Sequence, residues 1–181
     1  GLGALSGSLH GGANAKVMKM LLDLRKEKDI PGWVERTLAR GDRIMGMGHA
    51  VYKTMDPRAA FLKTMAARLG KKSGLENWHR LSTEIERAGI EAFRSRGKTN
   101  ILPNVDFFSA SVYHMMGIAR DLFTPVFAIS RIAGWAAHII EEQFAGAAPK
   151  PVLYRPESEY VGDYCGPEVC EFTPIEQRKR Q

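Results

Sequence analysis

The stretch IMGMGHAVYKTMDPRA occupies residues 44–59 and constrains the fold and the function of this chain more than any other segment. In it, two glycines bracket a methionine directly before His49, and Arg58 follows nine residues later. Asp56 and the proline after it predict the N-cap and the first residue of a helix, which places Arg58 at a helix N-terminus. Free backbone N–H groups, the helix dipole and a guanidinium all favour an anion there. The stretch predicts an anion site beside a titratable histidine; a glycine turn before a surface helix is the alternative, because short glycine motifs are weak signals.

Composition limits the class of protein. The chain has 181 residues and 44% hydrophobic content, which suits one ordinary domain or two small lobes. A formal charge of +6 and a pI near 9.4 favour an acidic partner, either nucleic acid or a small polyanion such as a carboxylate or phosphate. The basic residues are spread along the chain, and only RKR at 178–180 forms a run. We therefore expect no nucleic-acid partner.

Cysteine usage and hydropathy bear on the compartment. Cys165 and Cys170 have a spacing that fits no zinc or redox motif, so two reduced thiols and a cytoplasmic location are expected. No apolar run approaches the roughly 18 residues of a membrane span, so no membrane partner is expected. The chain begins with glycine, inside a glycine-rich motif, which suggests the C-terminal part of a longer protein.

Hydrophobic periodicity predicts an all-α fold. Apolar residues recur at helical spacing in most of the chain, and no run alternates with period two for more than a few residues. Capping residues and glycines set the expected ends, with Asn14 and Thr124 as N-caps and Gly41, Gly70 and Gly117 as stops. The expected helices span 15–28, 33–40, 58–69, 75–96, 104–116 and 125–143.

Asp106 is a candidate base. It lies in the first turn of the helix opened by Pro103 and Asn104, between apolar neighbours. The helix N-terminus lowers the pKa of such an acid and burial raises it, and the sequence does not decide between them. The alternative is an ordinary acid that compensates the helix dipole.

Arg131 and His10 complete the candidate residues found by pattern. The helix 125–143 is apolar almost all round and is expected to be buried on most sides, with Arg131 in its middle and no acid three or four residues further on. A buried guanidinium needs an acid from another segment or an anionic ligand. His10 precedes two glycines before the first helix, where the dipole favours a neutral ring; a flexible terminal loop is the alternative.

These motifs, in this order, resemble those of the citrate synthase family along nearly the whole chain. The matching signatures are LHGGAN, GMGHAVYK, DPR, PNVDFF, FTPVFAISRIAGWAAHI and RPESEYVG. The resemblance implies a helical homodimer in which a small domain, here residues 14–122, is inserted into a large domain, here residues 1–13 and 123–181. It also implies an acyltransferase that condenses acetyl-CoA with oxaloacetate to give citrate and CoA, with no permanently bound cofactor or metal.

The resemblance also implies the role of each site residue. Asp106 would take a proton from the acetyl methyl group, and His10 would donate to the thioester oxygen. His49 would donate to the ketone oxygen of oxaloacetate. The carboxylates would be bound by Arg58, Arg131 and the Arg155 of the neighbouring subunit. CoA would contact Ile44, Met45, Gly46, Met47, Gly48 and Lys53.

Three questions stay open at this stage. The upstream half of the family, which includes a further oxaloacetate-binding histidine, is absent from these residues, so the chain is either a fragment or one subunit of a split enzyme and is expected to be inactive without that half. The residues FFSASVYHMMG at 107–117 also resemble 2-methylcitrate synthases, which use propionyl-CoA. A non-catalytic helical module that binds CoA or a dicarboxylate is the third possibility; a histidine metal site is disfavoured because no two of the five histidines have i, i+4 spacing.

Overall fold

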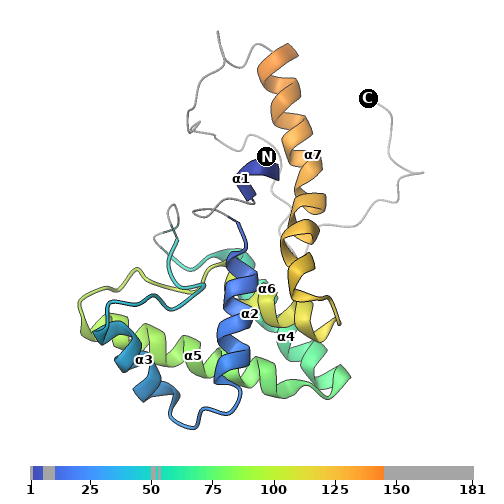
Figure 1. Ribbon diagram of the computed structural model, residues 1–181. Helices are drawn as coiled ribbons and strands as arrows, with labels where there is room; N and C mark the ends of the chain where they lie inside the picture. Colours follow the sequence, from blue (N-terminus) through green and yellow to red (C-terminus); the bar gives the residue numbers. More distant parts are fainter. Residues whose placement is uncertain (1, 6–10, 50–51, 53, 145–181) are drawn as a thin grey trace, which may run out of the picture. The chain divides into compact units, whose positions relative to one another are not determined.

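A computed structural model describes residues 2–5, 11–49, 52 and 54–144 (Figure 1). The helices are α1 (Leu2–Leu5), α2 (Ala13–Leu24), α3 (Ile30–Ala39), α4 (Pro57–Ser73), α5 (Glu76–Ser95), α6 (Val105–Met115), the 3₁₀ helix η1 (Arg120–Leu122) and α7 (Phe123–Phe144). Within the described residues the strand-like pairing is limited to an isolated bridge between Met47 and Pro103. The prediction of an all-α fold is confirmed.

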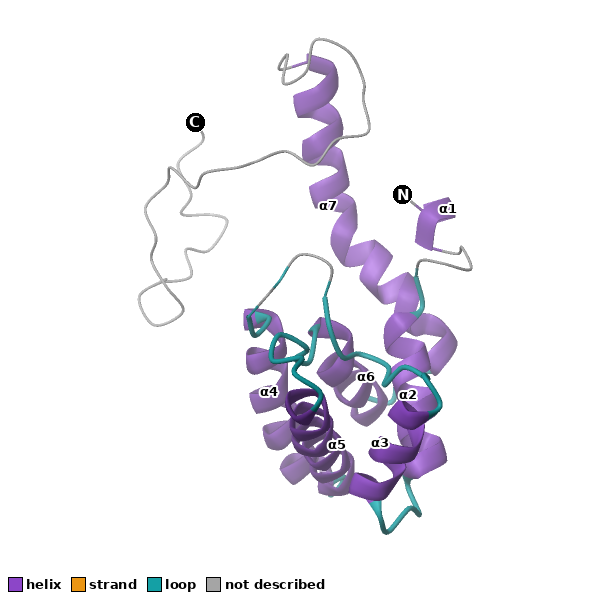
Figure 2. Ribbon diagram, turned by 90° about the vertical axis from the view of Figure 1, so that its left-hand side faces the viewer, coloured by secondary structure: helices purple, strands orange, loops and turns teal. Residues whose placement is uncertain are grey.

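Helix α6 is the element around which the other helices pack. It contacts α2, α4 and α5, and the ribbon shows it between them (Figure 2). Its residues Phe107, Phe108 and Ala110 are at most 1% exposed, because both faces of the helix meet a neighbour. The helix begins where Asn104 caps it, as the sequence predicts. The candidate base Asp106 therefore lies in the first turn of the most buried helix described.

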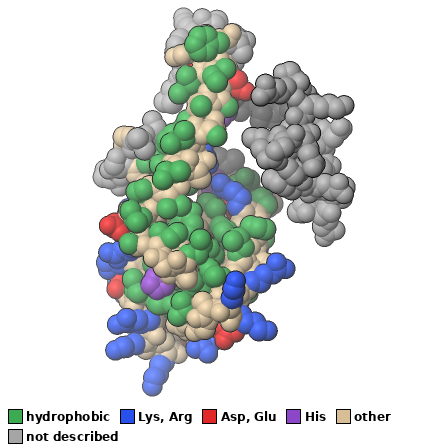
Figure 3. Space-filling model, turned by 90° about the vertical axis from the view of Figure 1, so that its right-hand side faces the viewer, with side chains coloured by type: hydrophobic (Ala, Val, Ile, Leu, Met, Phe, Trp, Pro, Cys, Tyr) green, Lys and Arg blue, Asp and Glu red, His purple; other side chains and the backbone are tan. Residues whose placement is uncertain are grey.

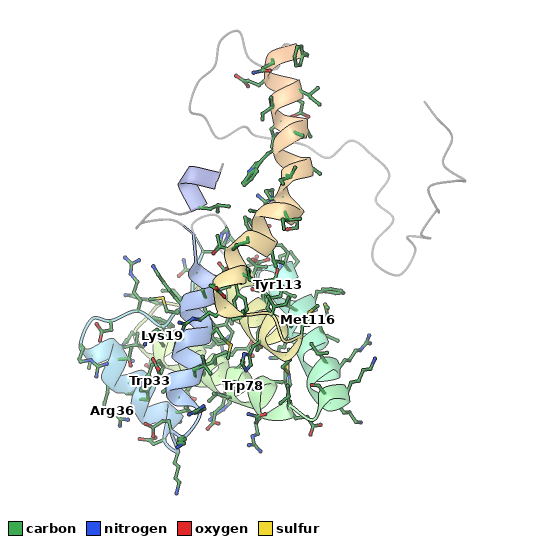
Figure 4. The ribbon with its side chains drawn as sticks, turned by 45° about the vertical axis from the view of Figure 1, so that its right-hand side comes forward. Lys19, Trp33, Arg36, Trp78, Tyr113 and Met116 are labelled. Carbon is green, nitrogen blue, oxygen red and sulfur yellow. The ribbon has the colours of Figure 1, made fainter. Side chains whose placement is uncertain are left out.

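Aromatic contacts fix α6 to the helices before and after it. The ring of Trp78 on α5 meets the ring of His114 edge-on, with 4.7 Å between centroids, and burial lowers the pKa of His114. Tyr113 meets Phe123, the first residue of α7, in the same manner at 5.3 Å. Trp78 and Tyr113 are labelled in Figure 4. The apolar residues at helical spacing in 75–96 face the core: Trp78, Ile85, Ala88, Ala92 and Phe93 are buried, and Leu75 and Leu81 are partly buried.

Several helix ends differ from the prediction: α2 ends at Leu24 and not at residue 28, and α3 begins at Ile30, capped by Asp29, and not at residue 33. Two further differences involve glycine. Helix α2 begins at Ala13, with Gly12 at the N-cap in the left-handed region (φ 66°), so Asn14 lies inside the helix. Helix α4 continues past Gly70 to Ser73 and ends at Gly74, whose φ is 69°. A β-carbon on Gly70 would lie 3.1 Å from the Cα of Glu76. Gly70 therefore allows α5 to approach closely instead of ending α4.

The start and the environment of α7 also differ from the prediction. The 3₁₀ turn η1 leads directly into the helix, so Thr124 is its second residue and not its N-cap. Among the described residues only Phe123 and Ala128 of this helix are buried, and the exposed large side chains include Ile129, Ile132, Ile139, Ile140 and Phe144. The expectation of burial on most sides is therefore wrong for this chain, since no described element covers these side chains. Hydrophobic side chains are visible at the surface in Figure 3.

The helical segment Arg120–Phe144 is long and apolar enough to cross a membrane, judged by length and composition in a search of the described residues. The expectation that no apolar stretch approaches that length is therefore wrong. The mean hydropathy of this helix is high enough although Arg131 lies within it. One such helix is weak evidence for a membrane span.

Residues 1–140 and 141–181 form two compact units. The first contains every element up to most of α7, and the second is described only at residues 141–144. These two units do not test the predicted small domain, residues 14–122, or the predicted large-domain parts, residues 1–13 and 123–181. The domain assignment stays a prediction.

Candidate active site at the start of helix α6

The first turn of α6 carries Asp106 and is capped by Asn104. The side-chain oxygen Oδ1 of Asn104 accepts the backbone N–H of Asp106 at 3.0 Å. Its amide Nδ2 donates to the carbonyl oxygen of Gly48 at 2.8 Å. One side chain thus starts the helix of the candidate base and binds the glycine loop of residues 44–48.

Backbone hydrogen bonds hold the same loop against the segment before α6. The N–H of Gly48 donates to Leu102 at 2.8 Å, and the N–H of Asn104 donates to Gly46 at 2.9 Å. Gly46 has a φ of 80°, and a β-carbon there would lie 2.9 Å from the ring of Phe107. Only glycine allows this backbone to lie so close to the base of α6.

Asp56 binds both Arg58 and the start of α6. Its Oδ1 accepts the Arg58 Nε at 3.0 Å, its Oδ2 accepts Nη2 at 2.8 Å, and the backbone N–H of Val105 also donates to Oδ2 at 3.2 Å. Burial alone would raise the pKa of Asp56, but the hydrogen bonds from Arg58 outweigh burial and hold that pKa below its ordinary value. The same hydrogen bonds raise the pKa of Arg58, and the charge of Asp106 adds to this effect. Arg58 is therefore a permanent cation fixed beside Asp106.

His49 is oriented by the residue three positions later. The backbone N–H of Tyr52 donates to its Nδ1 at 3.0 Å, and the two rings lie 4.7 Å apart. Because Nδ1 accepts this hydrogen bond, the neutral ring carries its proton on Nε2. The Arg58 guanidinium lies 5.6 Å from the centre of the Tyr52 ring, so the histidine and the arginine share one neighbour.

A cavity of about 210 Å³ brings the predicted residues together. His49, Arg58, Asp106 and Arg131 all line it. Arg131 is exposed, and its guanidinium lies 4.9 Å from the centre of the Phe127 ring on the preceding turn. The prediction that Arg131 is buried is therefore wrong, and its neighbour is an aromatic ring of its own helix. Among the described residues no carboxylate forms an ion pair with Arg131, and the acid in the lining of the same cavity is Asp106.

A second cavity, of about 640 Å³, lies along the glycine loop. Four of the predicted CoA-contacting residues line it, namely Ile44, Met45, Gly46 and Met47. Lys16, Arg43 and Lys98 line it as well, so the cavity has apolar walls and basic side chains. This combination suits an aromatic base attached to phosphates.

Some residues of the candidate site lie outside the described part of the chain, and others were not recognised from the sequence. His10, Lys53 and Arg155 fall on residues that the structure does not describe. Asp56 and Asn104 were predicted only as helix caps, although each also binds a second site element. The sequence feature that could have indicated these roles is a hydrogen-bonding side chain two residues before a site residue: an acid before Arg58 and an amide before Asp106. A search of the described residues finds no cluster of three metal-binding side chains.

Comparison with known proteins identifies the family. The family model described as "Citrate synthase, C-terminal domain" matches residues 1–157. This chain belongs to the citrate synthase family. Citrate synthase 2 of Bacillus subtilis is 45% identical over 98% of this chain and 44% of its own length. The 2-methylcitrate synthase of Shewanella oneidensis is 38% identical over 89% of this chain and 40% of its own length.

The fold comparison agrees. Citrate synthase from Thermoplasma acidophilum, solved as a ternary complex with carboxymethyl coenzyme A and oxaloacetate, superposes with a TM-score of 0.71 at 36% identity, over 98% of this chain and 45% of that one. The chain thus spans less than half the length of the citrate synthases it matches.

Proposed function

We propose that this chain supplies the C-terminal part of an enzyme that condenses acetyl-CoA with oxaloacetate and releases citrate and CoA. The observation that carries the proposal is the cavity in which a histidine, an aspartate and two arginines from four separate segments meet. By "the complete enzyme" we mean this chain joined to the further segment that its relatives contain. Activity is proposed for the complete enzyme, not for the 181-residue chain alone.

Asp106 starts the reaction by taking a proton from the methyl group of acetyl-CoA. The electron pair of the broken C–H bond is delocalised onto the thioester oxygen, which gives an enolate. The enolate oxygen accepts a hydrogen bond from His10. The enolate carbon then attacks the ketone carbon of oxaloacetate and forms the new C–C bond. The ketone oxygen takes a proton and becomes a hydroxyl, with Nε2 of His49 as the proposed donor. Water finally attacks the thioester of citryl-CoA, the C–S bond breaks, and CoA leaves as the thiol.

The arginines bind the dicarboxylate. Arg58 keeps N–H groups free of Asp56, because Asp56 engages only Nε and Nη2 of a side chain with five donors. Arg131 forms no ion pair with a described carboxylate, and it supplies a second cation for a substrate carboxylate. We propose that Arg155 of the neighbouring subunit supplies a third in a homodimer. CoA lies along residues 44–48 with its phosphates near the basic side chains of the second cavity and near Lys53.

The exposed side chains of α7 fit the same proposal. An apolar helix with most of its large side chains in water is unfavourable, since burial of each would contribute about 1.5–3 kcal/mol. In the complete enzyme these side chains pack against the further segment, within a large domain formed by residues 1–13 and 123–181 together with it. This packing would leave α7 inside the protein and not across a membrane; a cytoplasmic location stays a proposal.

The experiment is a thiol-release assay on the complete enzyme with oxaloacetate and either acetyl-CoA or propionyl-CoA. We expect thiol release that requires oxaloacetate and is greater with acetyl-CoA. Greater turnover with propionyl-CoA would favour 2-methylcitrate synthesis, which the Shewanella relative and residues 107–117 support. Calorimetric binding of oxaloacetate and CoA without any thiol release would favour a non-catalytic module.

A further inference from the structure

The first N–H groups of α6 all donate hydrogen bonds within the protein, so none of them is available for a ligand. Val105 donates to Asp56, Asp106 donates to the side chain of Asn104, and Phe107 donates to the carbonyl of Asn104. Asn104 itself donates to Gly46. This helix end is therefore not an anion site, and its donors are used to join other parts of the site to Asp106.

Among the described side chains, only Asn104 hydrogen-bonds both the loop 44–48 and the backbone of Asp106. Its oxygen fixes the backbone of Asp106, and its nitrogen fixes the carbonyl of Gly48, the residue before His49. The two hydrogen bonds use opposite ends of one planar amide, so a displacement of the loop 44–48 turns the group that caps the helix. Neither aspartate nor serine can reproduce both bonds at once, because a carboxylate has no donor and a hydroxyl is too short to span them.

We propose that Asn104 is a positioning residue that couples occupancy of the loop 44–48 to the placement of Asp106. CoA bound along the loop would restrain Gly48, and the amide of Asn104 would pass this restraint to the first turn of α6. The proposal rests on the proposed function, in which CoA contacts the loop and Asp106 is the base. The binding of one substrate would thereby order the group that activates it.

The variant Asn104→Asp separates coupling from capping. Aspartate has nearly the same shape and still accepts the N–H of Asp106, so the helix start is retained. It lacks the amide donor, so the hydrogen bond to Gly48 is lost. Asn77→Asp is the matched control, because it makes the same chemical change at an exposed position in the first turn of α5, away from both cavities.

The measurement is amide hydrogen exchange of the complete enzyme, followed by mass spectrometry, with CoA itself as the probe. In ligand-free Asn104→Asp we expect exchange in residues 44–48 to rise about three- to tenfold, the effect of one lost hydrogen bond. In the wild type and in Asn77→Asp, CoA should slow exchange in both 44–48 and 104–108. In Asn104→Asp, CoA should still slow exchange in 44–48 but should slow exchange in 104–108 less than in the wild type, because only the backbone hydrogen bonds from Asn104 to Gly46 and from Gly48 to Leu102 then join the two segments.

Two results would overturn the inference. The first is that the loop 44–48 exchanges at the same rate in ligand-free Asn104→Asp as in the ligand-free wild type. The second is that CoA protects residues 104–108 as much in Asn104→Asp as in the wild type. A merely structural role of Asn104 predicts faster exchange in both segments with no change in the response to CoA. If CoA protected neither segment of the wild type, the proposed function would fail instead, and the ligand-free comparison would still decide whether Asn104 holds the loop.

Discussion

Asp56 and Arg58 are joined by two side-chain hydrogen bonds, of 3.0 and 2.8 Å, and the carboxylate of Asp56 is 1% exposed. The same carboxylate accepts the N–H of Val105 at the start of α6. The arginine proposed to bind oxaloacetate is therefore attached to the helix that carries the proposed base. A buried acid between them keeps the cation in place before any substrate arrives.

Removing the charge of Asp56 should destabilise the protein in a pH-dependent way. We expect Asp56→Asn to lower the free energy of unfolding by about 1.5–3 kcal/mol at pH 7, since it weakens hydrogen bonds to a buried charge. The pKa of Asp56 in the folded state is below its unfolded value of about 3.9, so its contribution is complete above that pH and is lost as pH falls through the folded pKa. Urea unfolding of both proteins at pH 7 and pH 3 measures the difference. An equal difference at both pH values would contradict this account.

Gly46 should be harder to replace than a glycine with a similar φ in open space. Gly46→Ala places a methyl group 2.9 Å from Phe107 and Val17, whereas Gly97, with a φ of 73°, has no neighbour within 4 Å. Both variants carry the strain of a left-handed alanine, but only Gly46→Ala is also overpacked. We expect it to be about 1–3 kcal/mol less stable than Gly97→Ala in urea unfolding. Equal losses would show that the loop does not lie against α6 as described.

Subunit mixing tests the proposed dimer. If Arg155 completes the neighbour's site, a subunit with Arg131→Ala and a subunit with Arg155→Ala form a hybrid with one intact site. Equal mixing of the two inactive complete enzymes should restore roughly a quarter of the wild-type activity, since half of the dimers are hybrids. No recovery, with subunit exchange verified by mass spectrometry of tagged subunits, would count against a shared site.

Local capping chemistry made much of this fold predictable. Asp56 and Asn104 were identified as caps because a short polar side chain before a helical pattern satisfies free N–H groups. Gly70 was misinterpreted because the sequence does not show that another helix approaches there. Arg131 and the exposed side chains of α7 were mispredicted for a related reason, since periodicity indicates that a helix is apolar but not which chain covers it.

The candidate site was predictable only in part. The residue types of His49, Arg58, Asp106 and Arg131 indicated the chemistry, and their order along the chain indicated the family. Their meeting in one cavity depends on how four segments pack, which spacing does not determine. The second roles of Asp56 and Asn104 depend on contacts to residues 49 and 56 positions away, respectively, and these could not be inferred from local sequence.

The central claim is that Asp106 removes the proton from the acetyl methyl group. Asp106→Asn keeps the size of the side chain and the cap from Asn104 but removes the proton acceptor, so kcat should fall about 10²–10⁴-fold with oxaloacetate affinity nearly unchanged. An acid that only compensates the helix dipole would instead contribute about 0.3–1 kcal/mol of stability and leave turnover nearly normal.

The most direct measurement is hydrogen–deuterium exchange of the methyl group of acetyl-CoA, catalysed by the complete enzyme with an oxaloacetate analogue bound, which isolates the proton-transfer step. The account predicts that the wild type exchanges this methyl group and that Asp106→Asn exchanges it at least a hundredfold more slowly, about the lower limit for a positioned base. Exchange by Asp106→Asn at the wild-type rate would contradict the account, because Asp106 could then not be the base.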